Sequence, residues 1–323
     1  MADDLIAGVA WREADLAPVT GSLRQLASVR RFTLDDGPEQ GVRAIAFDTG
    51  GGLAFTVLEG RTLDIATLSW RGLACAWQSP TGFRHPGLHN GEAENGQGFL
   101  RSFSGLLVTC GLDHIRQPKD GRPLHGRLPF TPARLTACGE CWESEEPHLF
   151  AEAEIVQATS DGENWRLRRR IEAPIGGGAL RLVDTVTNRS REARPQPILY
   201  HMNLGFPLLR PGAELTLDGE LLIGPLGPPD GGAGPRVACQ RIAGAGRVAL
   251  TAPGEPAMRL ALEIDAATLP YLQTWLDVRP GMYVLGLEPC NADRAPDGTT
   301  VDDAGLVLPS GASRRYALTL RLG

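Results

Sequence analysis

The chain has 323 residues, enough for one large domain or two smaller ones, and it can bury a core without disulfides or a structural metal. Its formal charge of −6 argues against a surface for nucleic acid or for an anionic membrane. Lys119 is the sole lysine, which leaves little scope for Schiff-base chemistry.

Near the N-terminus, residues 20–29 predict the one good helix, because Leu23, Leu26 and Val29 recur at helical spacing. From there on, short segments alternate apolar and polar residues, a pattern typical of strands. The 40 glycines and 25 prolines supply the turns that many antiparallel strands need. The expected strands cover residues 42–47, 54–58, 61–68, 151–156, 165–171, 180–186, 247–250, 258–264 and 316–322.

The order of these segments indicates the fold class. Strands do not alternate with helices and no repeat of constant period is visible, which argues against a parallel sheet and a propeller. Residues 224–234 are rich in Pro and Gly, but strands are expected after them, so we interpret them as a loop. The sequence therefore predicts an all-β protein, a large antiparallel β-sandwich with few short helices. We expect residues 1–323 to form a single domain, with residues 1–40 as an N-terminal extension that includes a short helix.

The cellular location of the protein and its lack of a zinc site are predicted from patterns that are missing from the sequence. No apolar run is long enough to span a bilayer and no signal-peptide pattern is present, so we expect a cytoplasmic protein. Cys138 and Cys141 are the one closely spaced pair among six cysteines, and a zinc site needs more ligands nearby. We therefore expect reduced thiols at a hairpin turn.

Arginines gather on one expected strand, at positions 166, 168, 169 and 170. The simpler interpretation is a solvated face that pairs with the acidic strand carrying Glu152 and Glu154. Anion binding is the alternative.

Residues 77–127 lack clean alternation and are dense in polar groups beside glycines, as functional loops often are. Four of the six histidines lie there, and with Asp113 they form a set of candidate metal ligands. No HExxH or compact two-histidine, one-carboxylate signature is present, so we do not expect a metal.

Two apolar, strand-like runs each contain one ionisable side chain. His201 follows Ile198-Leu199-Tyr200, and Glu288 follows a run that begins at Tyr283. A histidine and a carboxylate in partly desolvated strands suit general acid and general base catalysis near neutral pH. They are 288 − 201 = 87 residues apart, so only the fold could bring them together. The alternatives are a hydrogen-bonded core histidine and an ion-paired core glutamate.

Five segments in this order resemble the aldose 1-epimerase (galactose mutarotase-like) superfamily, and a less-characterised bacterial branch of it in particular. The similarity runs from about residue 45 to the C-terminus. The five segments are Trp77-Gln78-Ser79-Pro80-Thr81-Gly82, Thr109-Cys110-Gly111-Leu112-Asp113-His114, Leu124-His125-Gly126-Arg127, Tyr200-His201-Met202-Asn203 and Gly286-Leu287-Glu288-Pro289.

The resemblance implies a β-sandwich whose concave face binds a sugar without a cofactor. It implies that His201 is the general acid to the ring oxygen and Glu288 the general base on the anomeric hydroxyl. Arg101 and His125 would bind and orient the sugar. Further expected contacts are Asp113, His114, Asn203, Trp77 and Trp275. An aspartate that binds sugar hydroxyls in well-studied mutarotases has no clear counterpart, and the candidates are Asp218, Gln273 and Asp277.

The sequence thus predicts an isomerase that interconverts the α and β anomers of a free sugar or sugar derivative. Its partner would be a small carbohydrate, with no nucleic acid or membrane, and the protein would be a monomer or homodimer. One alternative is a non-catalytic carbohydrate-binding or sensing domain. Another is a lyase or other enzyme that acts on a modified sugar acid.

Overall fold

The computed structural model describes residues 5–6, 9–232, 234–301 and 303–323, and it describes side chains from residue 11 onward. Antiparallel strands dominate these residues and the helical segments are three or four residues long, which confirms the predicted all-β class. No described helix is long and apolar enough to cross a membrane.

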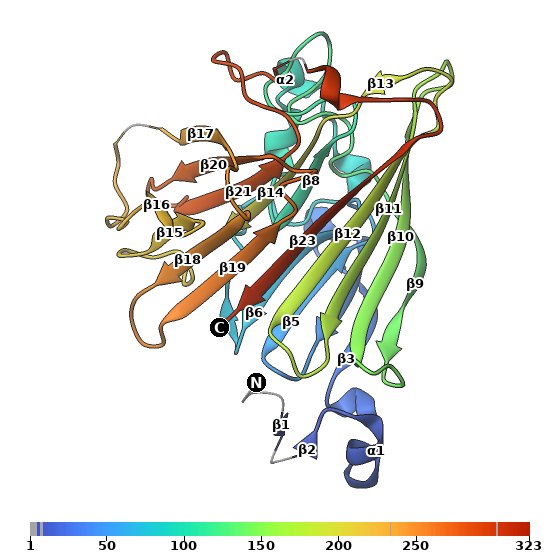
Figure 1. Cartoon of the computed structure of the whole chain (residues 1–323), viewed down its shortest axis with the longest axis vertical. Coiled ribbons are helices and arrows are strands. Elements are labelled where there is room, and N and C mark those ends of the chain that lie inside the picture. Colours follow the sequence, from blue (N-terminus) through green and yellow to red (C-terminus); the bar gives the residue numbers. More distant parts are fainter. Residues whose placement is uncertain (1–4, 7–8, 233, 302) are drawn as a thin grey trace.

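The largest sheet has nine strands and spans the front of Figure 1 in the order β16-β15-β18-β19-β23-β12-β11-β10-β9. Its long central strands alternate buried residues with half-buried or exposed ones, as expected for a sheet with one face in the core. In chain order the nine strands are β9 (Arg134–Cys141), β10 (His148–Ala158), β11 (Asn164–Pro174), β12 (Ala179–Asn188), β15 (Glu214–Leu217), β16 (Glu220–Ile223), β18 (Arg247–Ala252), β19 (Met258–Ile264) and β23 (Ser313–Leu322).

Two five-stranded sheets lie behind the first. One is built from consecutive hairpins in the order β3-β4-β5-β6-β7, and the other has the order β17-β20-β21-β14-β8. The first contains β3 (Ser28–Thr33), β4 (Arg43–Asp48), β5 (Leu53–Leu58), β6 (Asp64–Trp70) and β7 (Leu73–Ala74). The second contains β8 (Leu107–Gly111), β14 (Ile198–Leu204), β17 (Arg236–Arg241), β20 (Tyr271–Asp277) and β21 (Val284–Cys290).

The remaining elements are short. Two-stranded pairings join β1 (Leu5–Ile6) to β2 (Val9–Ala10) and β13 (Arg194–Pro195) to β22 (Val307–Leu308). The α-helices are α1 (Glu13–Leu16) and α2 (Ala93–Gly96). The 3₁₀-helices are η1 (Ala17–Val19), η2 (Leu23–Gln25), η3 (Gly37–Glu39), η4 (Pro86–Leu88), η5 (Gly98–Arg101) and η6 (Ala304–Leu306).

One continuous apolar core joins all three large sheets. Phe47 on β4, Leu182 on β12 and Leu287 on β21 belong to the same buried cluster. The nine-stranded sheet therefore packs against both five-stranded sheets, which is the sandwich that the sequence predicts.

Strand β14 shows how this sandwich positions the site. Its seven residues are all buried, so both of its faces are covered. Tyr200 points toward the nine-stranded sheet, where its hydroxyl donates to Asp184 on β12 at 2.8 Å. Since side chains alternate along a strand, His201 points to the opposite face. There it meets residues 76–106 and 112–133, which we call the covering loops, and a second apolar cluster that includes Phe103.

Two expectations from the sequence need correction. The predicted helix over residues 20–29 is wrong: that segment contains only η2, and β3 begins at Ser28. Its apolar residues are spaced as in a helix because Leu23, Leu26 and Val29 pack on the core through a turn and a strand. The Cys138/Cys141 pair lies within β9 and not at a hairpin turn.

The arginine-rich strand is β11, and it divides its arginines between two faces. Arg166 and Arg168 pair with Glu154, and Arg170 pairs with Glu152, as the solvated-face interpretation predicts. Arg169 points the other way and is buried in the core.

Candidate functional site

Four polar side chains form a row across the outer face of the sheet β17-β20-β21-β14-β8. Cys239 on β17 pairs with Gln273 on β20, and Gln273 pairs with Glu288 on β21. The register of β21 with β14 places His201 opposite Glu288. Directly opposed residues of antiparallel strands share one face, so the strand register alone brings the two predicted catalytic residues together.

His201 and Glu288 are in contact and almost wholly buried. His201 Nε2 lies 3.3 Å from Glu288 Oε1, with side chains 6% and 1% exposed. Burial lowers the pKa of His201 below its usual 6.5, while the charge of Glu288 and the neighbouring Asn203 side chain act in the opposite direction. Because desolvation is the largest of these effects, neutral imidazole is favoured at neutral pH in the closed site.

Gly286 makes the contact between the pair sterically possible. A Cβ at this position would lie 2.9 Å from His201 Cε1 and 3.1 Å from Glu288 Oε1. It would also lie 3.3 Å from Trp275 Cβ, so the surrounding side chains would have to shift to accept a methyl group. The glycine of the Gly286-Leu287-Glu288-Pro289 segment thus opens the space in front of the two polar groups.

A second pair of residues lies behind the carboxylate of Glu288. Gln273 Nε2 donates a short hydrogen bond to Glu288 Oε2, and Arg116 Nε donates to Gln273 Oε1 at 2.8 Å. The guanidinium also donates to the backbone oxygens of Asp293 at 2.7 Å and Ala292 at 2.8 Å. Arg116 is 3% exposed, so these bonds replace the water that it loses on burial.

His125 completes one side of the site. Its ring centroid lies 5.5 Å from that of His201 and 4.9 Å from that of Phe99. The pKa of His125 is held well below 6.5, chiefly by burial and further by His201 and Arg116. Both His125 and Arg116 have positive φ, 64° and 72°, and Arg116 N donates to His125 Nδ1 at 3.3 Å. Such strained backbone is characteristic of residues whose placement matters for function.

Aromatic rings close the other sides. The ring centroid of His201 lies 4.9 Å from Phe103 and 5.7 Å from Trp275. Trp77 packs edge-on to Trp275 at 6.4 Å and donates its indole N–H to the backbone oxygen of Met282. Trp77 is buried and Trp275 is only partly buried, so Trp275 is the more exposed of the two rings.

The structure does not bring Arg101 to this group. Its side chain is 65% exposed and forms an ion pair with Glu94. Asn203 is fully buried next to the site, and its side-chain amide donates to the backbone oxygen of Gly105 at 2.9 Å. Among the described residues, the arginine that reaches the row is Arg116.

Asp113 and His114 support the loop that carries His125. The Asp113 carboxylate accepts from the backbone N–H of Arg127 at 3.1 Å and from its guanidinium at 2.9 Å. Gly126 has φ +77°, and a Cβ there would lie 2.3 Å from the backbone oxygen of His114. His114 Nε2 lies 2.6 Å from the backbone oxygen of Gln117. This close packing explains why Gly126 follows His125 in the Leu124-His125-Gly126-Arg127 segment and why Arg127 lies next to Asp113.

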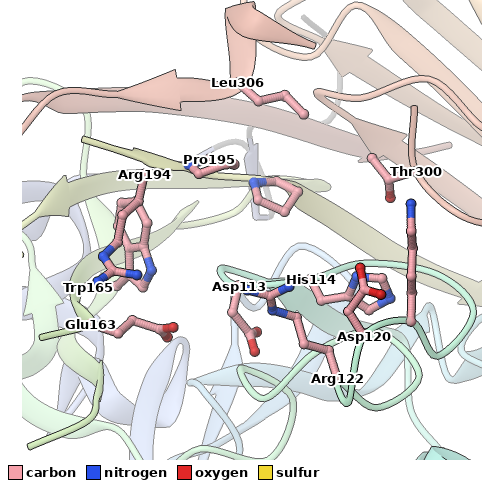
Figure 2. Close-up of a pocket in the computed structure, with 12 residues that line it drawn as sticks. Asp113, His114, Asp120, Arg122, Glu163, Trp165, Arg194, Pro195, Thr300 and Leu306 are labelled. Atoms are coloured by element: carbon pink, nitrogen blue, oxygen red, sulfur yellow. The ribbon is translucent and has the colours of Figure 1, made fainter. Parts of the chain in front are cut away.

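Asp113 and His114 also line a separate cavity of about 170 Å³ (Figure 2). Neither His201 nor Glu288 belongs to its lining. Its charged side chains are of both signs, so the cavity has no clear preference for an anion or a cation. They are Asp113, Asp120, Glu163, Lys119, Arg122 and Arg194.

Of the three candidates for the missing sugar-binding aspartate, one lies in the row. Asp218 caps a turn through the backbone N–H of Arg247, and Asp277 forms an ion pair with Arg279 at 2.6 Å. Gln273 is the candidate in contact with Glu288.

Sequence reasoning missed Arg116 entirely. Nothing in the residues around it marks Arg116 as different from other loop arginines, because Gln273 and Asp293, to which its guanidinium donates, lie 157 and 177 residues away in the chain. Phe99 and Phe103 stood within the unusual polar segment, but their contacts with His125 and His201 could not be read from spacing.

The arrangement can move protons at a single centre. An imidazole and a carboxylate at 3.3 Å can act together on two oxygens of one bound molecule, one as donor and one as acceptor. In the described part of the chain, no group of three or more His, Cys, Asp or Glu side chains is placed to hold a metal ion.

Residues 39–224 match a family model described as a domain of unknown function, DUF4432, a galactose mutarotase-like family. No curated protein matches the sequence.

Solved structures of low sequence identity share the fold. A candidate aldose 1-epimerase from Klebsiella pneumoniae has a TM-score of 0.79 at 20% identity, over 91% of this chain and 83% of its own. A galactose mutarotase-like protein from Clostridium acetobutylicum has a TM-score of 0.63 at 12% identity, over 91% and 98%. A galactose 1-epimerase from Lactobacillus acidophilus has a TM-score of 0.53 at 13% identity, over 91% and 98%. These likenesses show the galactose mutarotase-like fold.

Proposed function

The chain belongs to the DUF4432 family, which is galactose mutarotase-like, and from this premise we propose that it is an aldose 1-epimerase. It would interconvert the α and β anomers of a free sugar or sugar derivative. We propose that it acts in the cytoplasm on a small carbohydrate, as a monomer or homodimer.

The observation that supports this function best is the contact between His201 and Glu288. In a cyclic sugar the anomeric hydroxyl and the ring oxygen are bonded to the same carbon. An acid and a base that lie next to each other can therefore reach both oxygens at once. A pure binding site has no need of a matched proton donor and acceptor.

The proposed reaction opens and closes the ring. Glu288 takes the proton of the anomeric hydroxyl, the bond between C1 and the ring oxygen breaks, and protonated His201 gives its proton to that oxygen. The open-chain aldehyde then rotates about its C1–C2 bond. The same two proton transfers in reverse close the ring on the other face, so the enzyme returns to its starting state and no cofactor is consumed.

Neighbouring residues would hold the sugar during these steps. We propose that Trp275 stacks on a C–H face of the ring and that His125 contacts a hydroxyl. Trp77 would support Trp275 from behind, and Asn203 would hold the backbone of His201, to whose oxygen it donates. Asp113 and His114 would act through the loop of His125. Arg101 would reach the sugar only by leaving Glu94.

Access to the pair requires movement. The side chain of Glu288 is 1% exposed and that of His201 is 6% exposed, so a sugar cannot touch them in the closed arrangement. We propose that Trp275, which is partly exposed and in contact with His201, moves to admit the sugar. We therefore expect the tryptophan fluorescence of the protein to change when a substrate binds.

The test is exchange between anomers, measured by NMR on a panel of aldoses and uronic acids and corrected for the uncatalysed rate. Glu288→Gln and His201→Asn should each lower the rate by about 10²–10⁴-fold, the usual contribution of one positioned proton-transfer group. Glu263→Gln is the matched control, because Glu263 lies on β19 in an exposed ion pair with Arg321. A wild-type protein that never exceeds the uncatalysed rate with any sugar would contradict the proposal.

One observation favours a second candidate function, a carbohydrate-binding or sensing domain without turnover. Both catalytic candidates are almost wholly buried, so a sugar that binds at the partly exposed Trp275 without opening the site would not meet them. This function would be identified if a sugar binds and changes the tryptophan fluorescence while the anomers still exchange at the uncatalysed rate.

A further inference from the structure

We infer that Arg116 and Gln273 form a positioning relay that presents one chosen oxygen of Glu288 to the substrate, an inference that rests on the proposed function. Neither residue would touch the sugar. Arg116 would hold Gln273, and Gln273 would hold Glu288.

The orientation of the Gln273 amide follows from the chemistry of its neighbours. A guanidinium can only donate hydrogen bonds, so the atom that faces Arg116 Nε at 2.8 Å must be the amide oxygen. The amide nitrogen then faces Glu288 Oε2, to which it donates. The arginine thus removes the ambiguity between the two ends of the amide that a glutamine would otherwise have.

This orientation distinguishes the two oxygens of Glu288. Oε2 already accepts a hydrogen bond from the amide N–H of Gln273. Protonation of Oε2 is therefore disfavoured, because the new proton would compete with that N–H for the same oxygen. Oε1 accepts no hydrogen bond from the described residues and lies 3.3 Å from His201 Nε2. The proton taken from the substrate should therefore go to Oε1, the oxygen beside the general acid.

Several hydrogen bonds hold Arg116 in place. Its guanidinium donates to two backbone oxygens as well as to Gln273, at 2.7 Å for Asp293 and 2.8 Å for Ala292. In the described part of the chain it has no carboxylate within ion-pair distance, so an amide and carbonyls compensate its burial. Its backbone N–H also donates to His125 Nδ1. One residue at positive φ therefore sets the position of both the base and the neighbouring histidine.

The first variant separates this role from simple space filling. Gln273→Glu keeps the length of the side chain and still accepts from Arg116, but it removes the donor to Glu288 and adds a like charge beside it. If Gln273 only fills space and satisfies Arg116, this variant should anomerise sugar at the wild-type rate. If the relay is correct, kcat should fall by about 10–100-fold, as for other residues that orient a group in contact with the substrate, while KM changes less. The acidic limb of the kcat/KM profile should also move to higher pH.

The second variant tests the relay without any sugar. Gln273→Met keeps the volume but removes both hydrogen bonds, so Glu288 loses the partner that holds it near His201. The charge of Glu288 raises the pKa of His201 in the wild type. Loosening that carboxylate should therefore move the titration of the His201 ring, followed by ¹⁵N NMR, to lower pH.

Gln240→Met is the matched control. Gln240 lies on the neighbouring strand β17, is exposed, and pairs with Leu272, so the same substitution should leave the His201 titration unchanged. An unchanged titration in folded Gln273→Met protein would overturn the relay. A shifted titration in a protein whose wild type shows no anomerisation would retain the relay and reject the proposed function.

Discussion

Arg169 and Asp184 face each other across strands β11 and β12 and are joined by two hydrogen bonds, of 2.9 Å from Nε and 2.7 Å from Nη2. Both side chains are completely buried. Arg169 also donates to Asp64 on β6 at 2.7 Å, and Tyr200 on β14 donates to Asp184. One buried cation and its two carboxylates therefore connect all three large sheets behind the strand that carries His201.

Asp184→Asn should destabilise the protein strongly, because it leaves a buried guanidinium with one charged partner fewer. Removal of one member of a buried ion pair typically costs about 3–5 kcal/mol of unfolding free energy. Urea denaturation measures the loss. Glu152→Gln is the control: its ion pair with Arg170 is partly exposed, and such pairs contribute about 0–1 kcal/mol. Equal losses in the two variants would show that the buried pair has no special importance.

Gly286→Ala should lower the rate of anomerisation more than it lowers stability. The added methyl group would occupy the space between His201, Glu288 and Trp275, where the closest atom lies at 2.9 Å. Proton transfer depends on that geometry, so we expect a loss of at least about 10-fold in kcat. Gly227→Ala is the matched control, since a Cβ there meets nothing within 4 Å. Wild-type kcat in Gly286→Ala would mean that the substrate does not use this space.

The rate should depend on pH through His201. Burial lowers the pKa of His201 below 6.5, and the proposed acid must be protonated to act. As pH rises through that lowered pKa, His201 loses the proton that it must donate. The decline of kcat/KM with rising pH should therefore set in at a pH lower than 6.5. His201→Asn should abolish this limb of the profile. An alkaline limb well above pH 6.5 that disappears in His201→Asn would show that the free enzyme holds the proton more tightly than this environment implies.

Acid should destabilise the fold through its buried histidines. Burial lowers the pKa of His89 from 6.5 to about 4, and lowers those of His125 and His201 as well. Below about pH 6.5 these histidines bind protons in the unfolded chain but remain neutral in the folded protein. The stabilisation present above that pH is therefore lost as pH falls toward 4. Thermal unfolding between pH 7 and pH 4 measures it. His89→Gln should flatten the decline, and an equally steep decline in that variant would exclude His89 as a contributor.

Arg101→Ala is expected to have little effect. The side chain is exposed and its partner is Glu94, so both kcat and KM should stay within about two-fold of wild type, in line with the small worth of an exposed pair. A large rise in KM would instead reveal that substrate binding brings this arginine into the site. Steady-state anomerisation with the best substrate of the panel decides between the two.

Most of the fold was predictable from the alternation of apolar and polar residues along the strands. Residues 258–264 alternate in the sequence and form β19 with the same bounds, because one face of that strand lies in the core and the other in water. The helix expected at residues 20–29 failed because three leucine and valine side chains with helical spacing can reach the same core from a turn followed by a strand. Local spacing does not distinguish these two cases.

The site was predictable only in part. His201 and Glu288 stood out as ionisable residues in apolar runs, and the structure places them in contact, while their catalytic role stays a prediction. Arg116 could not be found, since its importance arises from contacts with Gln273 and the chain near residue 292, which depend on how the covering loops fold over the sheet. Arg101, chosen through the resemblance, lies on the exposed side of η5 instead.

The pairing of β14 with β21 has a consequence for how this protein can vary. Side chains alternate with a period of two, so a slip of β21 by a single residue would put Leu287 where Glu288 now faces His201. It would turn the carboxylate toward the apolar core at the same time. Insertions or deletions within these two strands would therefore abolish the chemistry and the packing together, whereas length changes at the exposed residues 227–232 would leave the pairing of the two strands unchanged. Sequence change that preserves activity should accumulate in such loops and leave the lengths of the two strands intact.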